Sequence, residues 1–177
     1  MLRFLVNLNF LITNFFSVIF QTREKRIAKI LNKKKLKIAF AESCTGGLLS
    51  SRMTDLSGSS NYIMQNFVTY ANQAKVSLLG VKEGTIAEFG VVSEQIALEM
   101  AQGLLDNYEC DIAVSITGIA GPTGGSKQKP VGLAYACISD KNRVQVYKIQ
   151  KNSLICRRLM KYAFSNDVLD YLNVFLK

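Results

Sequence analysis

The chain alternates short apolar runs with segments whose apolar residues recur at helical spacing, and no other feature constrains its fold as much. Bounded apolar runs predict buried strands over residues 37–41, 67–70, 112–117, 131–138 and 144–149. Helical spacing predicts helices over residues 22–31, 48–56, 71–79, 94–108 and 154–176. The polar turn at residues 139–143 predicts a hairpin between the last two strands. We therefore expect an α/β protein, a single-domain α/β/α sandwich around a mixed β-sheet.

Composition narrows the chemistry that this fold can carry. A chain of 177 residues fits one domain at roughly 100–200 residues per domain, and 49% hydrophobic residues can supply its core. Histidine is absent, which excludes Ser-His and Cys-His pairs and every His-ligated metal. Cys44, Cys110, Cys137 and Cys156 form no Cys-x-x-Cys pair, so we expect neither disulfides nor zinc, and a reducing compartment. Apart from Cys44, we expect the cysteines to be small buried hydrophobes. No metal and no cofactor are expected.

The net charge of +9 is concentrated at the two ends of the chain. Residues 1–37 carry nine Lys or Arg and the single acid Glu24, and residues 141–177 carry eight against two. Residues 38–140 carry five against ten, so the middle of the chain is acidic. The basic run at residues 33–37 fits either a solvated helix end or a surface that binds phosphates or anionic lipid. No nucleic-acid-binding motif accompanies it, so no nucleic-acid partner is expected.

The first twenty residues form an apolar stretch, uncharged over residues 4–20, that allows three interpretations. The first is a signal peptide, but no small-residue cleavage site follows the apolar stretch. A membrane span would bury the amides of Asn7, Asn9 and Asn14 in hydrocarbon. We favour the third interpretation, an apolar extension (1–20) that precedes a complete domain (21–177). The expected location is the cytoplasm, with membrane association through residues 4–20 as the alternative.

Two glycine-rich loops each follow a predicted buried strand, at the place where α/β sheets bind ligands. Their glycines are Gly46 and Gly47 in the first loop, and Gly118, Gly121, Gly124 and Gly125 in the second. Either loop alone could be a tight turn that needs glycine, but the pair favours a binding site. Their spacings match neither a Walker loop nor a dinucleotide-binding fingerprint.

The first loop offers a nucleophile. Ser43 lies between a predicted strand and a Gly-Gly helix start, a placement that exposes a hydroxyl beside backbone N–H donors, although it could also be a plain N-cap. Cys44 and Thr45 are rivals, but Cys44 has no basic partner in view. Without histidine, a lysine of lowered pKa can serve as the base. Lys75 and Tyr70 stand near enough to face this loop as base and proton relay.

Four blocks of the sequence resemble the CinA carboxy-terminal domain family. They are AESCTGG (41–47), FVTYANQAK (67–75), GVVSEQIALEMAQG (90–103) and SITGIAGPTGGSKQKPVG (115–132), within a similarity over about residues 22–150. Stand-alone members of that family are nicotinamide mononucleotide deamidases. The resemblance therefore implies hydrolysis of a carboxamide, which gives nicotinic acid mononucleotide and ammonia. The resemblance also implies that residues 21–177 are an amidohydrolase domain whose binding partner is its substrate, a small pyridine nucleotide. We also expect a homo-oligomer.

The resemblance also assigns residues. Ser43, Tyr70 and Lys75 match the family's proposed catalytic set, and Thr117 and Gly118 match the lining of its substrate pocket. Backbone N–H groups near Thr45–Gly47 would stabilise an oxyanion, while the loop from Gly118 to Gly125, with Ser126 and Lys127 nearby, would hold ribose or phosphate. The candidate substrate-binding residues are Thr45, Gly46, Gly47, Thr117, Gly118, Gly121, Gly124 and Gly125.

The sequence departs from the family pattern after the last strand. A Gly-Asp-Arg step is replaced by Lys151-Asn152-Ser153, while Arg157 fits a later arginine. This departure leaves a second hypothesis open, a nucleotide-binding protein of the same fold with impaired turnover. A third hypothesis is a basic protein that associates with membranes or nucleic acid through residues 1–37.

Overall fold

The computed structural model describes the backbone of residues 1–177 and the side chains of all of them except residues 16–18. The chain forms a five-stranded sheet flanked by helices. The elements are α1 (Leu2–Phe20), α2 (Thr22–Lys34), β1 (Ile38–Glu42), α3 (Leu48–Thr54), η1 (Ser59–Asn61), β2 (Ile63–Val68), α4 (Asn72–Leu79), α5 (Glu83–Phe89), α6 (Glu94–Asn107), β3 (Ile112–Gly118), β4 (Leu133–Ser139), β5 (Val144–Gln150) and α7 (Arg157–Phe175).

The sheet is mixed, with strand order β2-β1-β3-β4-β5. Strand β1 pairs in parallel with β2 and β3, and β4 runs antiparallel to both β3 and β5. Strand β1, an interior strand between β2 and β3, is buried along its whole length, as expected of a strand covered on both faces. The α/β class and the hairpin over β4 and β5 confirm the sequence prediction.

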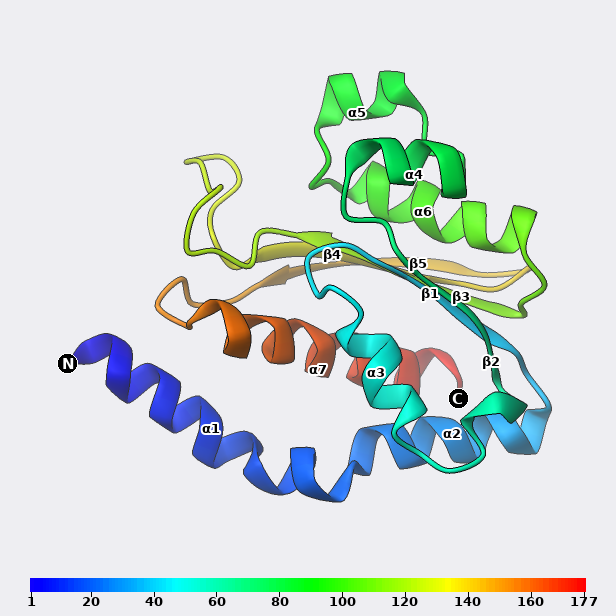
Figure 1. The fold of residues 1–177 in the computed structure, drawn as a ribbon, viewed down its shortest axis with the longest axis horizontal. Coiled ribbons are helices and arrows are strands. Elements are labelled where there is room, and N and C mark those ends of the chain that lie inside the picture. The colour runs from blue at the N-terminus through cyan, green and yellow to red at the C-terminus, as the bar shows by residue number, and fades with distance from the viewer.

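Helices cover both faces of this sheet, which makes three layers (Figure 1). On one face α4 and α6 pack over a core that includes Leu79, Met100 and Leu104, with α5 beyond them. On the other face α2, α3 and α7 enclose the larger core, which includes Phe40 and Phe164. Both cores exclude water from the apolar side chains of the strands, and this burial is the main stabilising contribution to the sandwich.

The topology brings three segments to one edge of the sheet. Strands β1, β2 and β3 run in parallel, so the residues that follow Glu42, Val68 and Gly118 all leave the sheet at the same edge. Strand β4 enters the sheet there, because Gly118 pairs with Ala134 near its start. The two glycine loops therefore lie next to each other and to the segment that carries Tyr70 and Lys75.

Most predicted elements are present near their predicted bounds, but β2 and α7 are shifted, and α1, η1 and α5 were not predicted. Ser93 caps α6 by accepting a hydrogen bond from the Ile96 N–H, and Gly80 ends α4 in a left-handed conformation, as predicted. Strand β2 ends at Val68, so Tyr70 lies in the loop before α4 rather than in a strand. Helix α7 begins at Arg157. Helix α5 was not predicted, because it buries no residue and so has no apolar stripe.

The apolar amino terminus forms helix α1, which lies across α7 (Figure 1). Its side chains Val6 and Phe10 pack against the larger core. Within the described part of the chain, no helix is both long and apolar enough to cross a membrane.

Candidate active site

Ser43 and Lys75 meet at the sheet edge. Ser43 is the first residue after β1, and its N–H donates to the carbonyl of Ile116 on the neighbouring strand, which fixes its backbone. Lys75 lies on α4, and its side chain is 1% exposed. The Lys75 Nζ atom lies 3.2 Å from Ser43 Oγ. The structure therefore brings the predicted nucleophile and the predicted base into direct contact.

The surroundings of Lys75 suit a lysine that exchanges a proton with Ser43. Its Nζ also lies 2.7 Å from the carbonyl oxygen of Thr69 and 3.4 Å from that of Tyr70. A neutral amine would donate two N–H groups to these carbonyls and accept from the serine hydroxyl, whereas an ammonium would donate to all three oxygens. Burial of Lys75 lowers its pKa, because removal from water disfavours the charged form.

The turn that carries Ser43 is held by a buried carboxylate, that of Glu42. Glu42 accepts hydrogen bonds from the N–H groups of Leu49 and Ser50 and from the hydroxyls of Thr45 and Ser50, at 2.6–3.0 Å. These bonds occupy donors in the first turn of α3 and a side chain of the preceding turn. Glu42 is thus a structural anchor for the turn around Ser43, and sequence analysis did not single it out.

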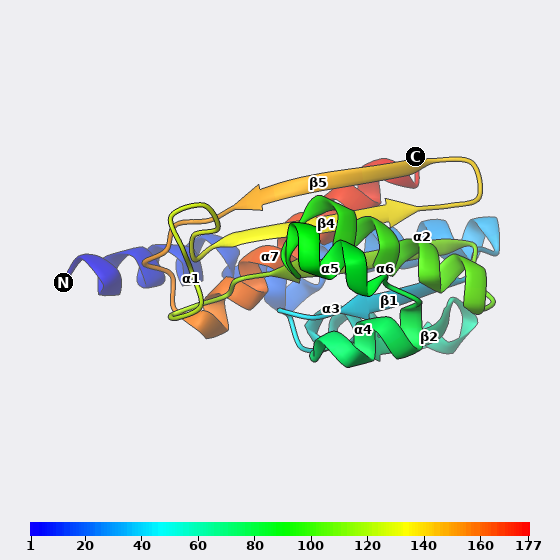
Figure 2. The same ribbon diagram turned by 90° about the horizontal axis from the view of Figure 1, so that it is seen from above.

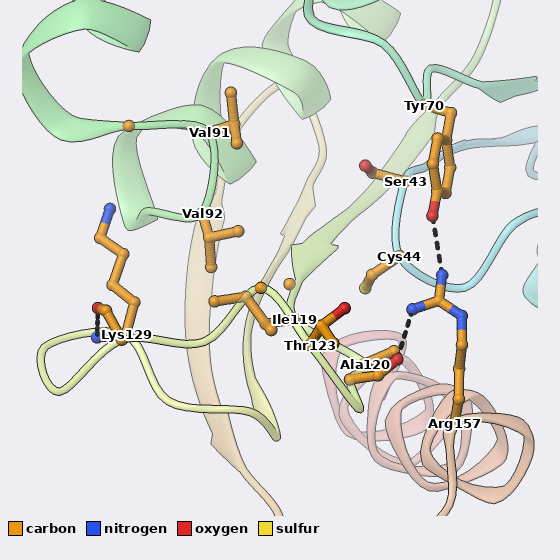
Figure 3. A pocket seen from close by; sticks show the side chains of 15 residues that line it. Ser43, Cys44, Tyr70, Val91, Val92, Ile119, Ala120, Thr123, Lys129 and Arg157 are labelled. Carbon is orange, nitrogen blue, oxygen red and sulfur yellow. Dashed lines mark hydrogen bonds between the residues drawn. The ribbon is translucent and has the colours of Figure 1, made fainter.

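The Tyr70 hydroxyl points toward Arg157, the first residue of α7 (Figure 3). This hydroxyl accepts a hydrogen bond of 2.8 Å from Arg157 Nη2. Arg157 Nη1 donates to the carbonyl of Gly121 at 2.8 Å, so one guanidinium joins the loop after β2 to the second glycine loop. The structure does not bring Tyr70 between Ser43 and Lys75, where a proton relay would stand.

A cavity of about 480 Å³ opens beside Ser43. Figure 3 shows Arg157 and Lys129 on opposite sides of it, with Val91, Val92 and Ile119 between them. It is lined by Ser43, Cys44, Tyr70, Gly90, Val91, Val92, Gly118, Ile119, Ala120, Gly121, Thr123, Gly124, Ser126, Lys129 and Arg157. None of these described lining residues carries a carboxylate, whereas two carry positive charge.

The candidate substrate-binding residues divide into two groups. Gly118, Gly121 and Gly124 line the cavity. Gly121 has a φ of 71°, and a Cβ there would come within 2.5 Å of Val131, so both conformation and packing require glycine. The residues that stand outside the lining are Thr45, Gly46, Gly47, Thr117 and Gly125.

The two threonines among those residues have structural partners instead. Thr45 is fully buried and donates to Glu42. Thr117 is 1% exposed and donates to the carbonyl of Val91 at 2.7 Å, so it holds the segment that forms one cavity wall. Thr117 therefore does not line the cavity itself but holds Val91, which does.

Some lining residues were missed by sequence analysis. Lys129 and the Val91–Val92 pair lie in loops and show no periodic signal. Arg157 was noted only as a match to the family, with no role assigned to it. The altered step at Lys151-Asn152-Ser153 lies outside the lining, and Lys151 forms an ion pair with Asp167 at 2.7 Å.

Cys44, the rival nucleophile, lies against the cavity but is 5% exposed. Burial, and then the charge of Glu42, raise the pKa of its thiol to about 12. It is therefore a thiol near neutral pH, which removes its nucleophilic form. Burial likewise raises the pKa of Cys110 to about 11 and that of Cys137 to about 12, as expected of buried cysteines. Cys156 is only half-buried, because it stands in the turn before α7.

Comparison with known proteins identifies the family. The family model described as CinA C-terminal domain matches residues 20–176. The chain belongs to the CinA C-terminal domain family. A CinA-like protein of Chlorobaculum tepidum is 46% identical over 159 residues, which cover 88% of this chain and 38% of that protein. A CinA-like protein of Chlorobium limicola is 54% identical over 120 residues, which cover 68% of this chain and 28% of that protein.

Solved structures of CinA proteins share the fold. The competence/damage inducible protein CihA of Agrobacterium tumefaciens superposes with a TM-score of 0.82 at 39% identity, over 87% of this chain and 94% of that one. A CinA superfamily protein of Klebsiella pneumoniae superposes with a TM-score of 0.83 at 26% identity, over 87% of this chain and 95% of that one. The chain thus spans about a third of the length of the curated CinA relatives described above, yet nearly the whole of these solved chains.

Proposed function

We propose that this CinA-family chain is an amidohydrolase that releases ammonia from the carboxamide of nicotinamide mononucleotide. The observation that carries the proposal is the contact between the buried Lys75 amine and the Ser43 hydroxyl, at the wall of a cavity that can hold a small molecule. A nucleophile and a base of lowered pKa within hydrogen-bond reach are the minimum for acyl transfer without histidine.

In the first half of the reaction, Ser43 Oγ attacks the carboxamide carbon and its proton passes to Lys75 Nζ. Lys75 then returns this proton to the amide nitrogen, the carbon–nitrogen bond breaks, and ammonia leaves. The substrate acyl group remains as an ester on Ser43. In the second half, water attacks the ester, Lys75 accepts the water's proton and passes it to Ser43 Oγ, and the acid is released. Each half uses the Nζ–Oγ contact of 3.2 Å and needs no relay through Tyr70.

The oxyanion that forms in each half needs N–H donors near Ser43. Gly46 N–H already donates to the carbonyl of Ser43, and the N–H groups of Leu49 and Ser50 donate to Glu42. Among the described residues of this turn, the N–H groups of Cys44, Thr45, Gly47 and Leu48 are not used in these bonds, and we assign the oxyanion to donors of this group, of which Cys44 lines the cavity. In a well-studied protease one such donor contributes about 3–4 kcal/mol to the rate.

The cavity supports a nucleotide as the substrate class. Its volume of about 480 Å³ lies in the usual range for small-molecule sites. Apolar side chains such as Val92 and Ile119 suit a flat ring, and the cations Arg157 and Lys129 suit a phosphate. No carboxylate in the described lining would repel that phosphate.

The test is ammonia release from nicotinamide mononucleotide by the full chain and by Ser43→Ala. We expect Ser43→Ala to lose at least about a thousandfold in kcat, because the covalent step disappears. Ser57→Ala, which changes an exposed serine outside the cavity, is the matched control and should keep full activity.

Calorimetric binding of the same nucleotide separates the alternatives. A native chain that binds the nucleotide and releases no ammonia would instead be a nucleotide-binding protein of this fold. A Ser43→Ala variant with full turnover would remove Ser43 as the nucleophile.

A further inference from the structure

The inner side of α1 contacts the domain through the amides of Asn7 and Asn14 as well as through Val6 and Phe10. Asn7 Nδ2 donates to the Leu154 carbonyl at 3.3 Å, and Asn7 Oδ1 accepts from the Cys156 N–H at 2.8 Å. About two turns further along the helix, Asn14 Oδ1 accepts from Asn166 Nδ2 at 2.9 Å. A helix that simply joined the core would turn its apolar side inward, whereas most of the large apolar residues of α1 lie on its other side.

The opposite side of α1 is an apolar surface that faces solvent. Among its described side chains, Leu5 is 52% exposed and Ile12 is 65% exposed. The exposed apolar residues of this outer face are Leu2, Phe4, Leu5, Leu8, Leu11, Ile12, Phe15, Ile19 and Phe20. A contiguous exposed apolar surface of this kind marks an interaction site, because water contact with it is unfavourable.

The charge next to this face is positive. Helix α2 buries Ile27 and Leu31 against the larger core, so its other side points away from the domain. That side carries Lys25, Arg26, Lys29 and Lys33, all exposed. The single acid of residues 1–37, Glu24, is buried and bonded to Arg52 at 2.6 Å. Every exposed charged side chain in this segment is therefore a cation.

The two helices occupy one outer layer of the molecule. Both pack on the side of the sheet away from α4–α6, and the amino-terminal half of α1 reaches past the end of the sheet (Figures 1 and 2). Since α1 and α2 each turn one side to the domain, their apolar and basic sides both face outward. Apolar side chains flanked by Lys and Arg are what a helix needs to lie in the surface of an anionic bilayer.

We propose that α1, with the basic side of α2, binds the surface of a membrane that contains anionic phospholipids. The apolar face of α1 inserts at the boundary between headgroups and acyl chains, and the α2 cations bind lipid phosphates. The helix lies in the plane, in keeping with the absence of a spanning helix from the described residues. A second copy of the chain is disfavoured as the occupant, because pairing through α1 would bring two like-charged α2 surfaces together.

The experiment is flotation of the full chain with two kinds of vesicle, phosphatidylcholine alone and phosphatidylcholine with about 30 mol% phosphatidylglycerol. We expect binding to the anionic vesicles only, weakened by salt. Leu5→Glu/Ile12→Glu should weaken it at least about tenfold, because two charges would enter the apolar layer. The matched control is Leu78→Glu/Leu98→Glu, which makes the same charge change at exposed leucines of α4 and α6 and should bind like the native chain.

A second set of variants tests the basic side without touching α1. Lys25→Gln, Lys29→Gln and Lys33→Gln should each lower the affinity for anionic vesicles by about fivefold, which is the ratio for about 1 kcal/mol per cation at a lipid surface. Circular dichroism checks that every variant keeps its helices.

Three results would overturn the proposal. The native chain could stay unbound to both vesicles. Leu5→Glu/Ile12→Glu could float as well as the native chain. Light scattering could show a dimer that this double variant dissociates while no vesicle is bound, which would make a second copy the occupant. Failure of any kind leaves the amidase proposal untouched, because ammonia release is measured without vesicles.

Discussion

Lys75 buries an amino group, and the cost of that burial depends on pH. Because burial lowers the pKa of Lys75 in the folded chain, the unfolded chain binds a proton over a range of pH in which the folded chain has lost it. Across that range, up to the ordinary lysine value of about 10.4, stability rises with pH. Lys75→Met removes this dependence. We expect the variant to be inactive, more stable than the native chain at pH 7, and to lose that advantage as the pH approaches 10.

Urea unfolding of both proteins at pH 7 and near pH 10 measures this effect. Lys82→Met, which removes an exposed lysine, is the control for loss of charge alone. An equal difference in unfolding free energy between Lys75→Met and the native chain at both pH values would contradict the argument.

Tyr70 tests whether a relay is needed between Ser43 and Lys75. Its hydroxyl is bonded to Arg157, while Lys75 contacts Ser43 directly. We therefore expect Tyr70→Phe to raise the KM for nicotinamide mononucleotide, because Arg157 loses one of its two fixing contacts, and to change kcat by less than about fivefold. Steady-state kinetics separate the two constants. A fall in kcat of about a hundredfold or more at unchanged KM would favour the relay.

At this scale the sequence predicted the contact between Ser43 and Lys75 better than the lining of the cavity. The absence of histidine allowed Ser43 and Lys75 as nucleophile and base, and the resemblance to the CinA carboxy-terminal domain family selected them. Lys129 and Val91 could not be singled out, because loops have no periodicity and their place follows from the packing of whole layers. Thr117 was assigned to the lining but donates to the Val91 carbonyl instead, a contact between residues 26 apart in the chain.

Among the elements, those with an apolar stripe were predictable and those without one were not. Helix α6 has a capped start and a buried face, so its bounds follow closely from the sequence. Helix α5 has no fully buried residue and was missed. The end of β2 was placed at Tyr70 because the aromatic pattern continues to that residue, whereas the chain already turns toward α4 after Val68.

The contact between α4 and α6 gives a prediction at this scale. Gly103 on α6 lies so close to α4 that a Cβ would fall 1.8 Å from the carbonyl oxygen of Leu79. Gly103→Ala must push α4 away from α6, so we expect a loss of about 2–4 kcal/mol in stability. Because α4 carries Lys75, ammonia release should fall as well. Thermal unfolding followed by circular dichroism measures the first effect.

Gly84 on α5 is the matched control for that substitution. A Cβ at Gly84 meets no atom within 4 Å. Gly84→Ala should therefore raise stability by about 0.5–1 kcal/mol, because alanine favours the helix and restricts the unfolded chain. If both alanine variants unfolded at the native temperature, α4 and α6 would be less tightly packed than the structure has them.

For the whole molecule, the question is how much the domain depends on α1. The match to the CinA family begins at residue 20, so it leaves almost all of α1 outside. The inner residues of α1 are nonetheless tied to α7. Asn7 binds the segment just before Arg157, and Asn14 binds Asn166, whose side-chain Oδ1 accepts from Arg52 Nη1 at 2.9 Å. Helix α1 thus supports both the cavity arginine and the buried ion pair between α2 and α3.

Deletion of residues 1–20 should leave a folded domain of lower stability. The sheet, both cores and the Glu24–Arg52 pair remain, so unfolding should stay cooperative. The deletion loses the side-chain hydrogen bonds of Asn7 and Asn14, worth about 0.5–1.5 kcal/mol each, together with the packing of Val6 and Phe10. For a chain of this size we expect the Tm to fall by about 3–10 °C.

Because Cys156 loses the acceptor that fixes the start of α7, kcat/KM should also fall, by less than about tenfold. Calorimetry and ammonia release measure the two effects. Asn7→Ala is the point variant that should reproduce most of the loss in kcat/KM and little of the loss in Tm. A deleted chain without a cooperative transition would instead make α1 an obligatory part of the fold.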